Sequence, residues 1–400
     1  MVKIFFSKSL SVVALTGLIL FLPPDSSRSQ QVSNAGLDSE RLTRISKAMN
    51  SFVERGTISG AVILVARGGK VFCLEAVGYQ DLESKKPMRP DTIFDLRSVT
   101  KPVTAIGIMI LIEEGKLALT DPVEKYLPEF KTTANEAPGT PEPITIHHLL
   151  THTSGLPFAR PPEIADITVY RNRSLAEIVA YLSKQKTDFV PGSQLRYCSS
   201  GFAILGRIIE VVSGRPYEQF IKERVFTPLG MKDSFFFIPA DKWDRVASIY
   251  QIQNGKLKKW EEIRDHSQNA KYPGPEFGMY STASDLVSLC QMMLDGGSFK
   301  GKRILSRMSV EAMTANHTLN IKSTHTQRPA YQGLGWGLSG DPMSDFPLTS
   351  VGSFGHNGAF GSIIWIDPNK SLIRIFLSHR LGFGDESNIF MAMAGAAVSD

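Results

Sequence analysis

The chain has 400 residues, enough for one large domain or two closely packed ones, and its 42% apolar and 21% charged residues are typical of a globular protein. Its formal net charge is +5. Such a small and evenly spread charge argues against nucleic acid as a partner.

Residues 1–29 have the form of a signal peptide. Lys3 and Lys8 precede an apolar stretch from Leu10 to Leu22, and Ser27-Arg28-Ser29 supplies small residues for a cleavage site. The stretch is short for a transmembrane helix. We therefore expect a secreted or periplasmic protein that would meet a membrane only if this segment stayed uncleaved.

The next residues predict a helix followed by a β-hairpin. The helix runs from Asp38 to Arg55, because apolar residues recur there at helical spacing. Those residues are Leu42, Ile45, Met49 and Phe52. Two apolar runs follow, Ala61–Ala66 and Val71–Val77, and Gly68-Gly69 between them favours a hairpin turn.

A long apolar run, Val103–Ile112, predicts a buried helix that ends at Gly115. Ser98 and Lys101 stand at its start, and residues three apart share a helix face with about 5–6 Å between them. A neutral lysine there can take the proton of the hydroxyl and make the serine a nucleophile, close to the positive end of the helix dipole. Ser183 and Lys186 have the same spacing, but their polar surroundings indicate the end of a surface helix.

Further helical and strand patterns define the expected fold. Strands are predicted at Ser362–Asp367 and Leu372–His379, and a last helix from about Ser387. Other helices are predicted at Ile146–Leu150, Leu175–Lys184, Phe202–Val212 and Ser284–Leu294, and a surface loop at Lys131–Thr145.

The economical arrangement of these elements is an α/β fold. One antiparallel sheet is built from both chain ends and flanked by helices, with an inserted, mostly helical subdomain. We expect one domain over residues 30–400. Its sheet region covers about 35–115 and 275–400, and its helical region covers about 116–274.

A serine activated by lysine also needs a proton carrier for the leaving group. Tyr197 stands on a predicted loop just before the helix Phe202–Val212, so its phenol could carry that proton. Ordinary half-buried packing is the alternative for this side chain. Tyr280, followed by Ser281 and Thr282, is a competing site of the same kind.

The mechanism also needs donors for the oxyanion. Residues 355–361 are rich in glycine and alanine, which lets a backbone approach a ligand closely. The N–H groups of Ala359 and Ser98 could form the oxyanion hole. His356 could orient a substrate carboxylate or polarise the lysine–tyrosine pair, or it could be a satisfied core histidine. Trp336 could line the substrate cleft or pack in the core.

Metal and cofactor sites are not indicated. His148 and His152 have the spacing of metal ligands on a helix, but no glutamate follows His148 as in the zinc-protease motif. Cys73, Cys198 and Cys290 have no metal or disulfide-framework spacing, and at most one bridge could form among them. We expect buried free thiols, and no metal or cofactor.

Taken together, three motifs resemble the serine β-lactamase/penicillin-binding protein superfamily, and its class C β-lactamase-like branch in particular, which includes esterases and D,D-peptidases. The resemblance runs from about Leu37 to the C-terminus. The motifs are Ser-x-x-Lys at 98–101, Tyr-x-Ser at 197–199 and His-x-Gly at 356–358, and further similar stretches are Leu149–Leu156, Pro228–Met231 and Gly278–Ala283.

The resemblance implies a role for each matching residue. Ser98 would be the acylated nucleophile, Lys101 its base, and Tyr197 the proton shuttle for the leaving group and the deacylating water. Ser199 and His356 would be supporting polar residues. The oxyanion hole would lie beside Gly358, at the N–H groups of Ala359 and Ser98.

Two departures from the family pattern argue against efficient β-lactam hydrolysis. Ser199 stands where β-lactamases have asparagine, and its shorter hydroxyl makes fewer hydrogen bonds. His356 stands where they keep a lysine, whose fixed charge attracts the β-lactam carboxylate. Neither change touches the nucleophile or its bases.

We therefore expect a serine hydrolase that works through an acyl-enzyme at Ser98, on a small ester, amide or β-lactam. Esterase activity is favoured over D-amino-acid peptidase action, and that over β-lactamase activity. The rival hypothesis is a non-catalytic protein that binds peptidoglycan or β-lactams. The presence of Ser98, Lys101 and Tyr197 together argues against it, because a binder does not need the proton-transfer set.

Overall fold

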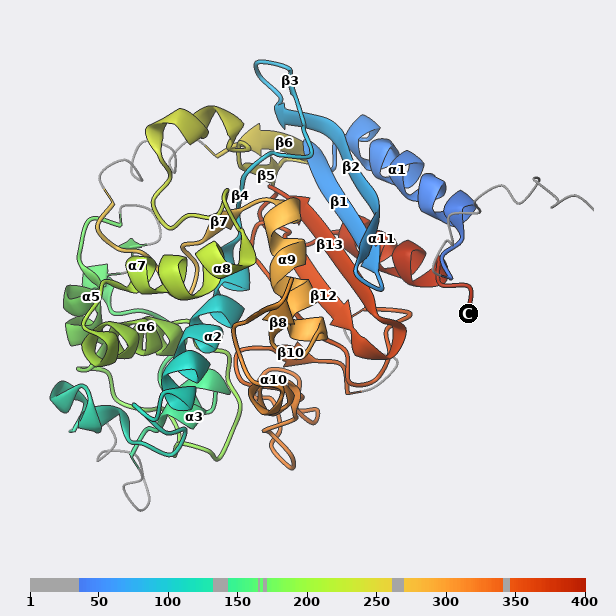
Figure 1. Cartoon of the computed structure of the whole chain (residues 1–400). Helices are drawn as coiled ribbons and strands as arrows, with labels where there is room; N and C mark the ends of the chain where they lie inside the picture. Colours follow the sequence, from blue (N-terminus) through green and yellow to red (C-terminus); the bar gives the residue numbers. More distant parts are fainter. Residues whose placement is uncertain (1–35, 132–142, 165, 168–170, 261–269, 341–345) are drawn as a thin grey trace, which may run out of the picture. The chain divides into compact units, whose positions relative to one another are not determined.

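The computed structural model describes residues 36–131, 143–164, 166–167, 171–260, 270–340 and 346–400, and residues 35–400 form one compact unit (Figure 1). The predicted signal peptide and residues 132–142 of the predicted surface loop lie outside the described residues. Among the described helices, none is long and apolar enough to cross a membrane.

A seven-stranded antiparallel sheet is the largest sheet of the described residues, and it confirms the predicted sheet built from both chain ends. Its strands, in spatial order, are β10 (Gly337–Leu338), β11 (Phe354–Asn357), β12 (Ile363–Asp367), β13 (Leu372–Ser378), β1 (Gly60–Arg67), β2 (Lys70–Asp81) and β3 (Lys86–Pro87). The predicted hairpin is β1–β2, in which Leu64 lies opposite Leu74. Strand β13 from the C-terminal part pairs with the other edge of β1, with Ala61 opposite Ser378.

Both faces of this sheet are covered, which explains why β1 is apolar along nearly its whole length. Helices α1 (Ser39–Glu54) and α11 (Asp385–Ala396) lie on one face, where they pack against Ile63. Val62 faces the opposite side, which is covered by α9 (Ala283–Leu294) (Figure 1). The four apolar residues predicted for the first helix are all buried, and Asp38 caps that helix through the N–H of Arg41.

The remaining helices of the described residues follow in chain order. They are α2 (Thr100–Glu113), α3 (Ile146–Leu150), α5 (Leu175–Leu182), α6 (Ser200–Ser213), α7 (Tyr217–Ile221), α8 (Thr227–Leu229) and α10 (Arg307–Thr314), with a π-helix at Lys222–Phe226. Short 3-10 helices lie at Arg97–Val99, Val123–Lys125, Pro128–Phe130, Pro162–Ile164, Ala240–Arg245 and Pro368–Lys370. Small two-stranded pairs are β4 (Phe94–Asp95) with β7 (Tyr280–Ser281), β5 (Tyr250–Gln253) with β6 (Lys256–Lys259), and β8 (Ser298–Phe299) with β9 (Lys302–Arg303).

Helix α2 is the buried helix predicted from the long apolar run. Every residue from Thr100 to Leu111 is buried, because α2 packs between the sheet and the helical region. The α-helix begins at Thr100, whereas Ser98 lies in the 3-10 turn Arg97–Val99 that leads into it. This corrects the expected position of Ser98 by less than one turn and leaves it at the N-terminal end of the helix.

Buried neutral histidines make the fold sensitive to acid. His379, which follows β13, accepts the N–H of Asp95 at Nε2 (2.7 Å), and its Nδ1 lies 3.0 Å from the carbonyl oxygen of Ala247. Burial lowers its pKa to about 4, and burial lowers the pKa of His356 on β11 to about 3. Below the ordinary value of about 6.5, the unfolded chain therefore binds protons that the folded chain does not.

We predict that the free energy of unfolding falls steeply as the pH drops from about 6.5 to about 4. Each of these two histidines contributes up to about 1.4 kcal/mol per pH unit in that range. Urea unfolding at half-unit pH steps measures how the free energy of unfolding depends on pH. His379→Gln, whose side chain cannot titrate, should lower the number of protons taken up on unfolding by about one. A wild-type stability that is constant over this range would contradict the prediction.

Candidate active site

Lys101 brings three polar groups together at the start of α2. Its Nζ lies 3.1 Å from Ser98 Oγ, 3.3 Å from Ser199 Oγ and 2.9 Å from the backbone oxygen of Glu276. The lysine is fully buried, whereas Ser98 is partly exposed. A neutral amine has two N–H donors and one lone pair. If the donors go to Glu276 and Ser199, the lone pair is left for the hydroxyl proton of Ser98.

Tyr197 lies against this group from the loop before α6. Its side chain is half-buried, and Lys101 Nζ lies 4.8 Å from the centre of its ring. The ring is 4.5 Å from that of His152 and 6.3 Å from that of His356, measured between centroids. The structure thus gathers the hydroxyl of Ser98, the amine of Lys101 and the ring of Tyr197 in one place. Within the described part of the chain, the competing Tyr280 is 3% exposed in β7 and makes no hydrogen bond to Lys101.

His356 lies near this group on β11 as a buried, neutral imidazole. Its Nδ1 is 2.8 Å from the carbonyl oxygen of Asn357. Burial, and then the charge of Lys101, lower its pKa to about 3. It is therefore uncharged at neutral pH and offers no fixed positive charge to a substrate carboxylate.

The glycine-rich turn after β11 packs directly on the segment that carries Ser98. A Cβ at Gly358 would lie 2.2 Å from the carbonyl oxygen of Leu96, so only glycine allows this approach. Two backbone hydrogen bonds fix the turn. The N–H of Gly358 donates to the carbonyl oxygen of Ser362 (2.7 Å), and the N–H of Gly382 donates to the carbonyl oxygen of Ala359 (2.9 Å). The backbone of Ala359 is thereby held beside the Ser98 segment.

Arg97, in the turn that carries Ser98, makes a second contact between the same two segments. Its guanidinium lies over the ring of Phe360, 4.0 Å from the ring centre, and its Nε is 3.3 Å from Asp95. The φ of Arg97 is +48°, a left-handed conformation directly before the serine. A positive φ at a non-glycine residue is uncommon and is found often at functional sites.

Comparison with known proteins agrees with this geometry. The family model described as Beta-lactamase matches residues 45–397. The chain belongs to the beta-lactamase family.

One relative of the chain is named as an esterase. The chain is 37% identical over 383 residues to Esterase EstB of Burkholderia gladioli, covering 89% of this chain and 95% of that protein. Among solved structures it is similar to EstCE1, described as a hydrolase with promiscuous acyltransferase activity, with TM-score 0.77, 27% identity, and 90% and 99% of the two chains covered. It is also similar to the octameric penicillin-binding protein homologue from Pyrococcus abyssi, with TM-score 0.70, 28% identity, and 90% and 77% covered.

These neighbours confirm the predicted fold, an antiparallel sheet with helices of the β-lactamase/transpeptidase type. They also support the coarse expectation of a β-lactamase-related hydrolase with esterase and penicillin-binding relatives. The finer expectations, including the serine mechanism, the substrate and secretion, stay predictions.

For this family member, the structure corrects the expectation that Trp336 lines the substrate cleft. Trp336 is fully buried, and its ring meets that of Phe354 edge to face at 5.2 Å. Core packing, the alternative, is what the structure supports.

Two polar groups at the site were not predicted from the sequence. The backbone oxygen of Glu276 accepts from Lys101, and its buried carboxylate pairs with Arg160 (3.3 Å) and accepts from the hydroxyl of Tyr272 (2.8 Å). His152 contacts Tyr197. His152 belongs to the similar stretch Leu149–Leu156, so the signal was present but gave it no role. A backbone acceptor such as that of Glu276 leaves no signature in a sequence.

The metal-ligand spacing of His148 and His152 has another explanation. His148 caps the start of α3, where its Nδ1 accepts the N–H of Thr145 (3.3 Å). His152 faces Tyr197, as described above. Among the described residues, no group of three or more metal-binding side chains converges. Cys73, Cys198 and Cys290 are buried free thiols.

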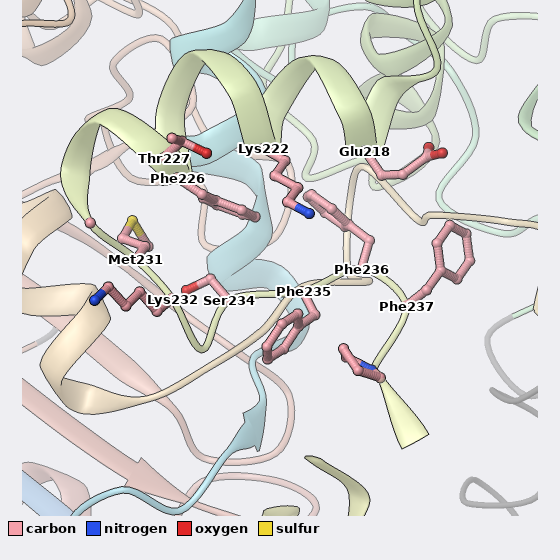
Figure 2. A pocket seen from close by; sticks show the side chains of 12 residues that line it. Glu218, Lys222, Phe226, Thr227, Met231, Lys232, Ser234, Phe235, Phe236 and Phe237 are labelled. Atoms are coloured by element: carbon pink, nitrogen blue, oxygen red, sulfur yellow. The ribbon is translucent and has the colours of Figure 1, made fainter. Parts of the chain in front are cut away.

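A cavity among the described residues lies away from these groups. It has a volume of about 530 Å³ and is lined by residues of α7, the π-helix Lys222–Phe226, α8 and the segment 230–239, including Lys222, Phe226, Met231 and Phe236 (Figure 2). Ser98, Lys101 and Tyr197 are not among its lining residues. The lysine cluster is the candidate site because a reaction needs its reactive groups in contact, which a large volume alone does not provide.

Proposed function

We propose that this protein is a serine hydrolase that forms an acyl-enzyme at Ser98 and cleaves small carboxylic esters. The observation that carries the proposal is the position of Lys101 Nζ, 3.1 Å from Ser98 Oγ and fully buried, with two other acceptors to hold it in place. A nucleophile within hydrogen-bond reach of an oriented base is the arrangement that covalent catalysis needs.

The proposed reaction has two halves. Ser98 Oγ attacks the ester carbonyl while its proton passes to Lys101, and the N–H groups of Ser98 and Ala359 stabilise the oxyanion. Tyr197 delivers a proton to the departing alkoxide, which leaves as the alcohol. Water then attacks the acyl group, loses a proton to the same bases and releases the carboxylic acid, so that Ser98 regains its hydroxyl.

Esters are favoured over β-lactams by the charge at the site. His356 is a neutral imidazole, with a pKa lowered to about 3, where β-lactamases keep a cation for the substrate carboxylate. Ser199 offers one hydroxyl, already 3.3 Å from Lys101, where those enzymes have an amide. The similarity to EstB, a protein named as an esterase, supports the same choice.

A labelling and turnover experiment tests the proposal. The full chain is exposed to a fluorophosphonate and to a penicillin, and the adducts are located by peptide mass spectrometry. In parallel, p-nitrophenyl butyrate, D-alanine amides and a cephalosporin are assayed for turnover. We expect a single fluorophosphonate adduct, on the Ser98 peptide, and butyrate turnover. A stable penicillin adduct without ester turnover would instead indicate a binder or a peptidase.

We also propose that residues 1–29 direct secretion of the protein.

A further inference from the structure

His152 is a buried residue beside Tyr197 to which the proposed mechanism gives no role. It follows the short helix α3, is 1% exposed, and has a φ of +59°. Its ring lies 4.5 Å from that of Tyr197, with 35° between the planes, and 5.3 Å from that of Phe202.

The backbone on both sides of Tyr197 is bonded to this one histidine. The N–H of Arg196 donates to the carbonyl oxygen of His152 at 3.0 Å. The N–H of Cys198 donates to Nδ1 of the His152 ring at 3.2 Å. The positions directly before and after Tyr197 in the chain are therefore both fixed on His152, and the tyrosine ring between them packs on the same side chain.

The Cys198 bond requires a neutral ring. Because Nδ1 accepts a proton, the proton of the neutral imidazole is on Nε2, and protonation of Nδ1 would break the bond. Burial holds the pKa of His152 well below its usual value. The acceptor is therefore present throughout the neutral range.

The other ring nitrogen gives an independent indication. Nε2 is buried and has no hydrogen-bond partner in the described part of the chain. An unpaired buried donor is unfavourable and calls for an explanation. An apolar ring would fill the same space without that cost, so the feature that needs a histidine here is the acceptor at Nδ1.

We infer that His152 is a positioning residue that holds the phenol of Tyr197 in place for proton delivery to the leaving alkoxide. The inference rests on the proposed function, in which Tyr197 carries that proton. It has a specific consequence for substrates. An ethoxide needs a proton in order to leave, whereas p-nitrophenolate leaves without one, so a displaced phenol should slow ethyl esters selectively.

Two substitutions separate the contributions of the acceptor and the ring. His152→Phe keeps an aromatic ring against Tyr197 but leaves the N–H of Cys198 unpaired. His152→Asn loses the ring but keeps an acceptor at the δ position, and asparagine tolerates a positive φ. The readout is kcat/KM for ethyl butyrate and for p-nitrophenyl butyrate, which reports acylation for each leaving group.

We expect His152→Phe to lower kcat/KM about 10- to 100-fold for ethyl butyrate and less than about 3-fold for p-nitrophenyl butyrate. His152→Asn should retain most of the activity on both esters. Tyr197→Phe should show the same selectivity as His152→Phe, and the double variant should be no worse than Tyr197→Phe alone.

Equal losses on both esters, or a His152→Phe variant that matches the wild type, would overturn the inference. A wild-type protein without Ser98-dependent hydrolysis of either ester would contradict the proposed function instead. Circular dichroism checks the fold of each variant. Should His152→Phe not fold, the comparison of His152→Asn with His152→Gln, whose acceptor lies one bond farther out, decides the question in the same two assays.

Discussion

Replacing Ser98 with alanine is expected to lower kcat for p-nitrophenyl butyrate by on the order of 10⁴-fold or more and to abolish the fluorophosphonate adduct. The substitution removes only Oγ, which is the atom that forms the acyl bond. Lys101 keeps its other acceptors, Ser199 and Glu276, and Ser98 is partly exposed, so the fold should be unaffected. Steady-state kinetics and intact-mass measurements check both outcomes.

The chain offers a matched control in its second serine–lysine pair. Ser183 follows α5, where its hydroxyl donates to the carbonyl of Ala180 at 3.0 Å, and Lys186 is exposed. This pair lies at the C-terminal end of a helix rather than at its start. Ser183→Ala should therefore leave kcat unchanged. If turnover survived in Ser98→Ala and disappeared in Ser183→Ala, the nucleophile would be Ser183 and the proposal would be wrong.

Much of the fold could be predicted because its signals are local. The hairpin β1–β2 consists of apolar runs on either side of Gly68-Gly69, and both glycines have a positive φ, as a tight turn requires. Helix α1 carries its apolar residues on one face. The pairing of β1 with β13 is not local. It could still be expected, because apolar strands at the two ends of the chain must be buried and have few other strands to pair with.

The arrangement of the site could be predicted only in part. Ser98 and Lys101 are three residues apart, so their contact follows from helix geometry. The contact of Lys101 with Glu276 joins positions 175 apart in the chain through a carbonyl group, and no residue type announces it.

The sequence left two alternatives open for Trp336, a wall of the substrate cleft or packing in the core. The choice depends on packing that its own residue type does not reveal. A Cβ at Gly335 would lie 2.5 Å from the Cβ of Ala105, so this glycine allows the chain itself to approach α2. At this position glycine therefore serves contact within the protein.

Lys101→Met is expected to lower kcat/KM for ester hydrolysis by about 10²- to 10⁴-fold, the usual contribution of a general base. Methionine is unbranched and apolar, so it can occupy the buried volume of the lysine stem while removing the amine 3.1 Å from Ser98. The hydroxyl of Ser98 would then have no base in contact. The fluorophosphonate labelling rate should fall with kcat/KM, because both report the nucleophilicity of the same oxygen.

The stability of this variant should move little, and that separates a catalytic role from a structural one. Loss of the amine leaves the carbonyl of Glu276 without its donor, at a cost of about 1 kcal/mol. It also removes a polar group from a fully buried position, which offsets that cost. Lys186→Met, at the exposed lysine of the second serine–lysine pair, should leave both rate and stability unchanged. Unfolding at a much lower urea concentration in Lys101→Met, with a rate reduced only in proportion to the folded fraction, would mean that the amine supports the fold and that Ser98 is activated by another group.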